Sequence, residues 1–343
     1  MKNSKVSIHD IARELQINSS TVSRALSDSP RVSRKTKDKI IAKAKELGYQ
    51  RNLLASSLRN SKSNTIGLIV PRISRHFFAS AIAGIEEVTQ KEGYSLIICQ
   101  SLEQSEREQK MIQTLSQNRV DGILISVSME TKSNINASDY IKNNIPVVFF
   151  DRHLDIPESS SVIIDDFQGG FIATEHLILQ GCKRIAHFAG PQELEIYKNR
   201  YKGYTSALEK HHLEVDENLV LSSKLMESDG VECAKKLLSQ PVPIDGIFSA
   251  NDVMAISAMQ YIKNQGLRIP EDIAIVGFSN EPISSVMVPS LTTVDQPGFE
   301  MGKRAANLLI SQINNKAEVR VGQKIVLKPA LIIRDSSTRR GGE

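Results

Sequence analysis

Aromatic, charged and amide side chains recur in this sequence where apolar, strand-like segments end. The strongest candidates for a common binding site are Phe77, Phe78, Asp151, Arg152, Arg200, Asn251 and Gln296. Aromatic faces suit the C–H surfaces of a sugar. Fixed carboxylate, guanidinium and amide groups suit its hydroxyls, because a ligand that leaves them unpaired is rejected. The set predicts a pocket for a small polar ligand, although Phe77 also fits a core position and Asp252 also fits a helix N-cap.

Strand-like and helix-like segments alternate through the sequence that carries these residues. Strands are expected at 65–70, 94–99, 122–126, 146–150, 161–164, 184–189, 246–249 and 273–277, with helices between most of them. Alternation at this spacing predicts parallel sheets covered by helices on both faces. Ligands of such folds bind at the carboxyl ends of the strands, where the candidate side chains lie.

Sequence patterns of catalysis give an enzyme little support. No Gly-x-Gly-x-x-Gly run follows a strand, no nucleophile elbow is present, and His and Glu show no metal-ligand spacing. Cys99, Cys182 and Cys233 are scattered, as expected for buried thiols in a reducing cytoplasm. We therefore expect no catalytic residue, no metal and no cofactor; an enzyme with an unrecognised site on this fold is an alternative.

The first sixty residues differ in charge from the rest. They carry 13 Lys and Arg against 5 Asp and Glu, a net charge of +8, whereas the other 283 residues have a net charge of −4. A basic module on a mildly acidic body predicts a polyanion partner for the module. A solvated basic surface is the alternative explanation of the charge alone.

A helix-turn-helix is predicted in this basic module. Apolar residues recur at helical spacing in residues 8–15 and 19–26, and a third helix follows Ser33 with Ile40 and Ile41 inside. The outward face of the second helix offers short hydroxyls and one guanidinium, from Ser19, Ser20, Ser23 and Arg24. Hydroxyls reach phosphates and bases, and arginine forks onto a guanine edge. These features predict DNA binding rather than a generic three-helix domain.

Several runs of this head, at 6–12, 21–26 and 47–49, resemble the regulators of the lactose/galactose-repressor family. The resemblance extends through almost the whole chain. It implies that the second helix lies in the major groove of double-stranded operator DNA. It also implies that His9 and Thr21 belong to the DNA-contacting residues.

Residues 51–60 resemble the hinge helix of this family, which folds on operator DNA and pairs across the dimer. By position, Leu58 is the residue that enters the minor groove, with Ala55 and Arg59 as further DNA contacts. An apolar wedge between base steps unstacks and kinks the duplex. The alternative for Leu58 is a linker residue that packs on the core. Ser56 stands where family members often carry Arg.

The remaining body resembles periplasmic sugar-binding proteins. The resemblance implies two doubly wound parallel-sheet subdomains, three crossovers and an effector cleft between them. The expected organisation is a head at 1–50, a hinge at 51–60, a first subdomain at 61–160 and 291–322, a second at 161–290 and 323–335, and a tail at 336–343. No leucine heptads follow the last strand, so a homodimer on a near-palindromic operator is expected.

Two cleft positions depart from the family pattern. Ser279 stands where the family usually has Asp, and Arg75 where sugar-binding relatives often have Asn. Guanidinium groups match carboxylate or phosphate as two-pronged donors. Cations are therefore expected to outnumber acids in the cleft, which favours a sugar acid or sugar phosphate as effector. The alternatives are that Arg75 points to solvent, or that Glu281 replaces the lost acid and the site binds a neutral sugar.

Taken together, the sequence predicts a DNA-binding transcriptional regulator, most simply a repressor, that a small polar effector controls allosterically. The start of the chain is polar, and no stretch approaches the roughly 20 apolar residues that span a bilayer, so a cytoplasmic location without a membrane is expected. A solute-binding protein for transport is the alternative; the basic head argues against it.

Overall fold

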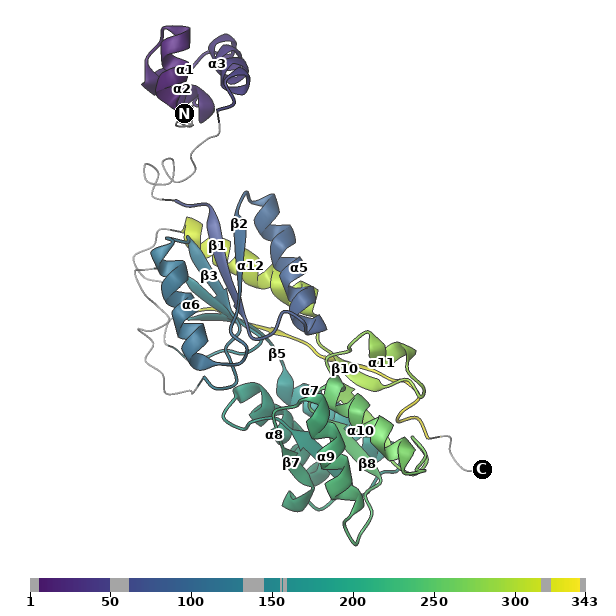
Figure 1. The fold of residues 1–343 in the computed structure, drawn as a ribbon. Coiled ribbons are helices and arrows are strands. Elements are labelled where there is room, and N and C mark those ends of the chain that lie inside the picture. Colours follow the sequence, from purple (N-terminus) through teal and green to yellow (C-terminus); the bar gives the residue numbers. More distant parts are fainter. Residues whose placement is uncertain are drawn as a thin grey trace. The chain divides into compact units, whose positions relative to one another are not determined.

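The computed structural model describes residues 6–49, 62–131, 145–154, 156, 159–315 and 322–339. The chain divides into two compact units, a helical head that precedes Asn64 and an α/β body that begins there (Figure 1). The expected hinge contacts Ala55, Leu58 and Arg59 lie outside the described residues.

Three helices form the head, as predicted. They are α1 (Ile8–Leu15), α2 (Ser19–Leu26) and α3 (Arg34–Glu46). The turn between α1 and α2 contains Gln16 at a φ of 53°, a left-handed conformation that reverses the chain within three residues. Ser33 caps α3 by accepting a hydrogen bond from the Thr36 amide at 3.3 Å.

The head has a small apolar core of its own. Its buried members are Ile11, Ala12, Val22, Ala25, Val32, Ile40 and Ala44. The expectation that Ile41 is also inside is wrong, because its side chain is 52 % exposed. Ile40 and Ala44 are four residues apart and share the face of α3 that meets the other helices; Ile41 is rotated away from that face.

Within the described residues, the body contains two six-stranded sheets (Figure 1). The first is entirely parallel, with the order β11-β5-β4-β3-β1-β2. Its strands are β1 (Thr65–Val70), β2 (Ser95–Gln100), β3 (Gly122–Ile125), β4 (Val147–Phe150), β5 (Ser160–Ile164) and β11 (Lys324–Leu327).

Helices cover both faces of this first sheet. One face packs on α5 (His76–Lys91) and α12 (Gly298–Asn314), the other on α6 (Ser105–Gln117). Leu68, Leu124 and Val148 point to the first face, whereas their chain neighbours Ile69 and Ile125 point to the second. Because both faces of the central strands are buried, β3 and β4 are buried at every position and β1 at every position after Thr65, which explains the nearly continuous apolar runs in the sequence.

The second sheet has the order β12-β10-β9-β8-β6-β7, with β12 antiparallel to β10. Its strands are β6 (Ile185–Ala189), β7 (Val220–Ser222), β8 (Gly246–Ser249), β9 (Ala274–Phe278), β10 (Thr292–Asp295) and β12 (Ala330–Ile332). One face packs on α7 (Asp166–Leu179) and α8 (Glu195–Lys210), the other on α9 (Glu227–Leu238) and α10 (Asp252–Asn264). Short elements η2 (Glu217–Leu219) and α11 (Ile283–Val286) lie in the connections.

The chain passes between the two sheets three times: from β5 to β6, from β10 to β11 and from β11 to β12. The eight strands predicted for residues 65–277 are present, each within one residue of its expected ends, and the doubly wound fold is confirmed. The expected subdomain ranges need correction, because β5 and β11 belong to the first sheet and β10 to the second. The sequence of β5, β10 or β11 does not indicate which sheet the strand joins, because strands of either sheet can pair with it.

Residues 336–339, expected to begin a tail, are built into the second subdomain. Ser336 and Ser337 are fully buried, and the Ser336 carbonyl accepts a hydrogen bond from the Ile275 amide at 2.8 Å. The Ser337 hydroxyl donates to Thr292 Oγ1 at 2.6 Å. Their small polar side chains therefore satisfy backbone and hydroxyl groups in the interior.

A histidine lies in the interior of the second subdomain. His187 of β6 is fully buried and stacks on Phe248 at 4.7 Å and Tyr204 at 5.1 Å between ring centroids. Its Nδ1–H donates to the Phe248 carbonyl at 3.0 Å, while Nε2 has no hydrogen-bond partner. Desolvation, with the nearby charge of Arg200, lowers the pKa of His187 to about 4, so the folded protein keeps this ring neutral.

This buried ring should make the protein acid-sensitive. The unfolded chain protonates His187 near its ordinary pKa of about 6.5, but the folded chain does so only near 4, so stability is lost as pH falls through this window. Between pH 7.5 and 5.5 we expect about 1 kcal/mol of loss from this residue. In urea unfolding, His187→Phe should lose about 1 kcal/mol less than wild type over that range. His212→Phe at an exposed position is the control, and equal losses in all three proteins would contradict the assignment.

Candidate functional site

A cavity of about 420 Å³ lies at the carboxyl ends of strands from both sheets. The structure brings every predicted effector residue to its wall: Arg75, Phe77, Phe78, Asp151, Arg152, Arg200, Asn251, Ser279 and Gln296. Parallel strands place the loops that follow them at one edge of a sheet, and the three chain crossings turn the two edges toward each other.

Asp151 occupies the centre of the polar wall. It follows β4 at a φ of 60°, a left-handed conformation that costs about 1–3 kcal/mol for a residue with a side chain. Gln296 Nε2 donates to its Oδ1 at 2.6 Å, and Ser126 Oγ donates to its Oδ2 at 3.4 Å. Ser279 Oγ in turn donates to Gln296 Oε1 at 3.4 Å. Desolvation raises the pKa of Asp151, and the remaining lone pairs of its carboxylate can accept from ligand hydroxyls.

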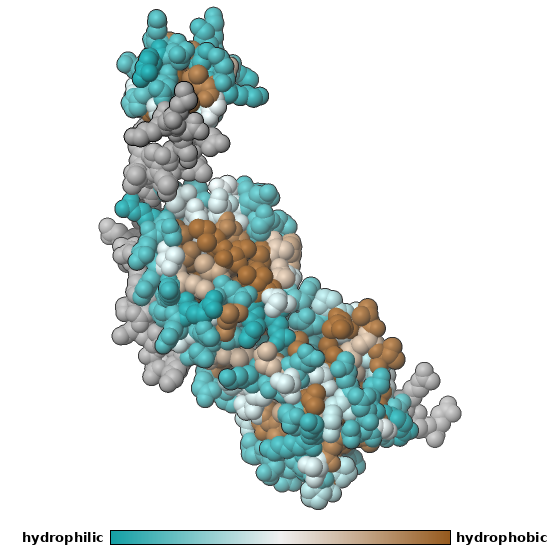
Figure 2. Space-filling view, in the orientation of Figure 1, coloured by the Kyte–Doolittle hydropathy of each residue, from teal (hydrophilic) through white to brown (hydrophobic). Residues whose placement is uncertain are grey.

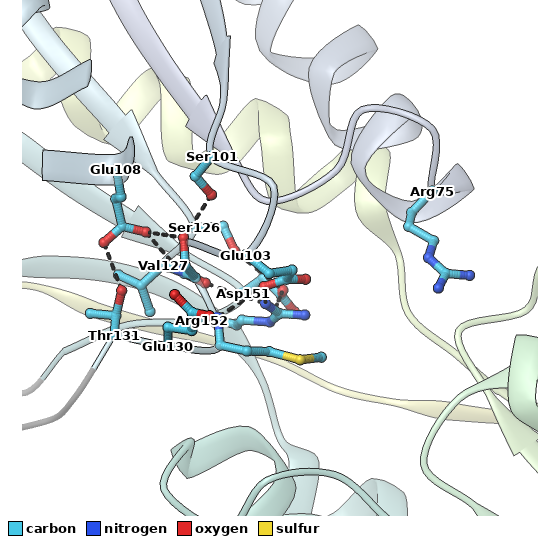
Figure 3. A network of polar contacts seen from close by, with 12 residues as sticks. Arg75, Ser101, Glu103, Glu108, Ser126, Val127, Glu130, Thr131, Asp151 and Arg152 are labelled. Carbon is cyan, nitrogen blue, oxygen red and sulfur yellow. Dashed lines mark hydrogen bonds and ion pairs between the residues drawn. The ribbon is translucent and has the colours of Figure 1, made fainter. Parts of the chain in front are cut away.

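Arg152 is held by an acid that the sequence reasoning did not include. Its Nη1 donates to Glu103 Oε2 at 2.7 Å, and its Nη2 to the Tyr197 hydroxyl at 3.3 Å. Figure 3 shows Glu103 and Asp151 close to Arg152, with Arg75 well apart from this network. Arg75 Nη2 instead contacts the sulfur of Met226 at 3.7 Å. Both Arg152 and Arg75 thus reach from the first subdomain to side chains of the second.

Arg200 of α8 is similarly compensated. Its Nε donates to Asp166 Oδ1 at 2.8 Å, its Nη1 donates to the Ala250 carbonyl at 2.7 Å, and its guanidinium lies 3.5 Å from the centre of the Phe278 ring. The close packing of α7 on α8 fixes this position. A Cβ on Gly170 would lie only 2.2 Å from the Arg200 carbonyl oxygen, so no larger residue fits there.

The expectation that cations outnumber acids in the cleft is wrong. Among the described residues that line the cavity, the cations Arg72, Arg75, Arg152, Arg200 and Lys224 face as many acids, Glu103, Glu130, Asp151, Asp252 and Glu281. The balance comes from loops that were not assigned to the cleft, those after β2 and β3. Glu281 also lines the cavity, in agreement with the alternative that it replaces the acid missing at Ser279.

Asn251, and not Asp252, caps the helix that follows β8. Asn251 is the N-cap of α10, since its Oδ1 accepts from the Met254 amide at 2.9 Å, while its Nδ2 donates to the Leu225 carbonyl at 2.9 Å. The alternative of Asp252 as N-cap is therefore wrong. The Asp252 carboxylate is buried and accepts hydrogen bonds at 2.6 Å from Thr293, 2.7 Å from the Glu281 amide and 2.9 Å from Ser284. Both residues line the cavity, yet their side chains mainly position the loops around it.

Glu103, Glu130 and Tyr197 are the cavity residues of most consequence that sequence reasoning missed. Glu103 follows β2 by three residues, so the position of the strand end is the sequence signal that indicates it. Among the described residues, no group of His, Cys, Asp and Glu could hold a metal ion. No helix in the described ranges is long and apolar enough to cross a bilayer.

The head presents a candidate nucleic-acid surface. On α2, Ser20 and Arg24 are exposed one turn apart, and Ser19, Thr21 and Ser23 are partly exposed. His9 is exposed on α1. Val22 and Ala25 hold the opposite side of α2 in the core. The helix therefore offers its hydroxyls and guanidinium outward, as a recognition helix requires.

Comparison with known proteins agrees with this arrangement. Residues 7–52 match the family described as bacterial regulatory proteins, lacI family, and residues 174–337 match a periplasmic binding protein-like domain. The chain is 36 % identical to the ribose operon repressor of Halalkalibacterium halodurans over 98 % of both chains. The chain belongs to the lacI family of bacterial regulatory proteins. It is 33 % identical to the transcriptional regulator DegA of Bacillus subtilis, over 97 % of this chain and 98 % of that protein.

Solved structures of two transcriptional regulators are similar over almost the whole chain. The lac repressor dimer bound to operator and the anti-inducer ONPF matches 98 % of this chain and all of that chain, with a TM-score of 0.85 and 25 % identity. The complex of the transcriptional regulator CelR with cellobiose matches 97 % of this chain and all of that chain, with a TM-score of 0.73 and 28 % identity. This member of the lacI family is accordingly a DNA-binding transcriptional regulator and not an enzyme.

Proposed function

We propose that this regulator is a cytoplasmic, homodimeric repressor whose operator affinity is set by a sugar bound in the cavity. One observation carries the proposal: side chains that follow strands of both sheets, such as Asp151 of the first and Gln296 of the second, line the same cavity. A ligand that touches both subdomains favours one arrangement of the two over another, and this is the physical requirement for control. The relatives named for ribose and bound to cellobiose support a sugar as the ligand class.

The charge balance favours a neutral sugar over a sugar acid or phosphate. Arg152 donates to the largely buried carboxylate of Glu103 and Arg200 to the buried carboxylate of Asp166, so neither central guanidinium carries an uncompensated charge. Asp151 and Gln296 offer an acceptor and an amide for hydroxyls, and Phe77 and Phe78 offer apolar surface. We infer that D-ribose and other small neutral sugars are the first ligands to test.

The dimer is supported by apolar surface on one face of the body. Strand β2 is an edge of the first sheet and exposes Ile97 and Ile98 at 39 % and 42 %. Near α11 of the second subdomain, Val286 and Val288 are 77 % and 79 % exposed. Figure 2 shows apolar side chains gathered over β2 and around α11 on the same side. Uncovered apolar patches of this kind mark interaction sites, and a second copy that covers both would contact both subdomains.

Readout of DNA should depend on Arg24. Its exposed guanidinium is the long donor on the outward face of α2, so Arg24→Ala should cost about 1–3 kcal/mol on operator and relax the preference at one base pair per half-site. Lys35→Ala, at an exposed position of α3, is the control that should weaken all sequences alike. Gel shifts on DNA from upstream of the protein's own gene measure both. An unchanged sequence preference in Arg24→Ala would show that Arg24 does not read a base pair.

Charge placed on the β2 edge should break the dimer. Ile98→Asp would bury a carboxylate against apolar surface of the partner, and we expect this variant to sediment as a monomer and to bind operator at least tenfold more weakly. Leu179→Asp, which replaces another exposed apolar residue, of α7, should stay dimeric. A dimeric Ile98→Asp would place the interface elsewhere.

Effector and operator should alter each other's affinity by one common factor. Linkage requires this reciprocity, and typical couplings are about 5–150-fold. A thermal-shift screen of neutral sugars, beginning with D-ribose, together with their acids and phosphates, would identify the ligand. Calorimetry with and without operator, and gel shifts with and without the sugar, then give the two factors. Equal sugar affinity in the presence and absence of operator would refute allosteric control.

A further inference from the structure

Glu103 reaches the cavity by an unusual backbone path. Leu102 and Glu103 follow β2 with left-handed φ values of 56° and 65°, and these turn the Glu103 side chain inward. Strand β2 is at the sheet edge, separated from β4 by β1 and β3. Glu103 Oε2 nevertheless accepts from Arg152 Nη1, which follows β4, at 2.7 Å and from the Met129 amide at 2.9 Å (Figure 3). The loop after β2 thus contacts the loops after two other strands.

The pair formed by Glu103 and Arg152 is mostly desolvated. The side chains are 16 % and 8 % exposed, and both line the cavity. Removing one member of such a pair is costly in a medium of low dielectric, because the other charge loses its partner. Without Glu103, Arg152 would keep one acid of the cavity wall, Asp151, whose Oδ2 lies 3.9 Å from Arg152 Nε, and its Nη1 would lose its carboxylate acceptor. Arg152 Nη2 is directed to Tyr197 across the cavity and its Nε has no hydrogen-bond partner. A guanidinium freed from Glu103 would therefore present a fork to an anion.

We propose that Glu103 sets the charge selectivity of the cavity. By occupying Nη1 and forming the closer of the two ion pairs of Arg152, it keeps the site open to neutral ligands and closed to anionic ones. The proposal deepens the proposed function and rests on it only in taking this cavity as the effector site.

Glu130 provides a matched comparison. It lines the same cavity, but its carboxylate accepts only from the Ser105 amide, at 3.4 Å, and forms no ion pair among the described residues. Glu130→Gln and Glu103→Gln remove the same charge from the same cavity. Only the second removes the partner of Arg152.

The test uses the full chain and inorganic phosphate as probe, titrated by calorimetry at constant ionic strength. Glu103→Gln should bind phosphate at least tenfold more tightly than wild type or Glu130→Gln. The double variant Glu103→Gln/Arg152→Met should lose this gain, which assigns it to the freed guanidinium. Glu103→Asp, which keeps the charge but shortens the side chain by one methylene, should show a smaller gain, and it serves as the test if Glu103→Gln does not fold.

Equal phosphate binding by Glu103→Gln and Glu130→Gln would overturn the proposal. So would wild-type binding as tight as that of Glu103→Gln, or a gain that survives loss of Arg152. Failure of the proposed function is distinguishable, because it would show as absent operator binding or absent sugar coupling in wild type whatever the phosphate result.

Discussion

The hydrogen bond between Gln296 and Asp151 is the contact on which the site depends. Asp151 ends a strand of the first sheet and Gln296 follows a strand of the second, so the 2.6 Å bond joins the two subdomains inside the cavity. Both side chains are buried, and a buried carboxylate without donors is costly. The left-handed backbone of Asp151 persists because this bond and that of Ser126 hold its carboxylate. A ligand that binds Asp151 must either donate to the free lone pairs of its carboxylate or take the place of Gln296 or Ser126 as donor.

Two further contacts cross the cavity, from Arg152 to Tyr197 and from Arg75 to Met226. They are longer than the bond between Asp151 and Gln296 and involve flexible side chains. A bound ligand that contacts both walls adds further contacts between the two subdomains to these. The ligand can change operator affinity only by the difference between its binding free energies for two arrangements of the subdomains.

Close helix pairs keep the walls of the cavity in place. In the first subdomain, a Cβ on Gly84 or Gly302 would lie 2.1 Å from a carbonyl oxygen of the facing helix, and in the second the same is true of Gly170 and Gly203 at 2.2 Å. Each pair lets two helix backbones meet without side chains between them. The pair α5 and α12 fixes the helix start that carries Phe77, and the pair α7 and α8 fixes Arg200. Close backbone packing at these points fixes each wall within its own subdomain, and the two subdomains are joined by the three connections that cross between the sheets.

The sequence by itself determined the elements and the cavity residues that follow their own strands. Continuous apolar runs revealed strands such as β1 and β8 because both faces of a covered parallel sheet are buried, and the strand-end rule then located Asp151 and Arg200. Short β7 and β11 went unrecognised, because three or four residues at a sheet edge carry too little pattern. Only the tertiary structure decided the electrostatics of the site. Whether Arg152 carries a free charge depends on Glu103, 49 residues earlier and three strands away, and no local pattern records which acid a buried guanidinium will meet.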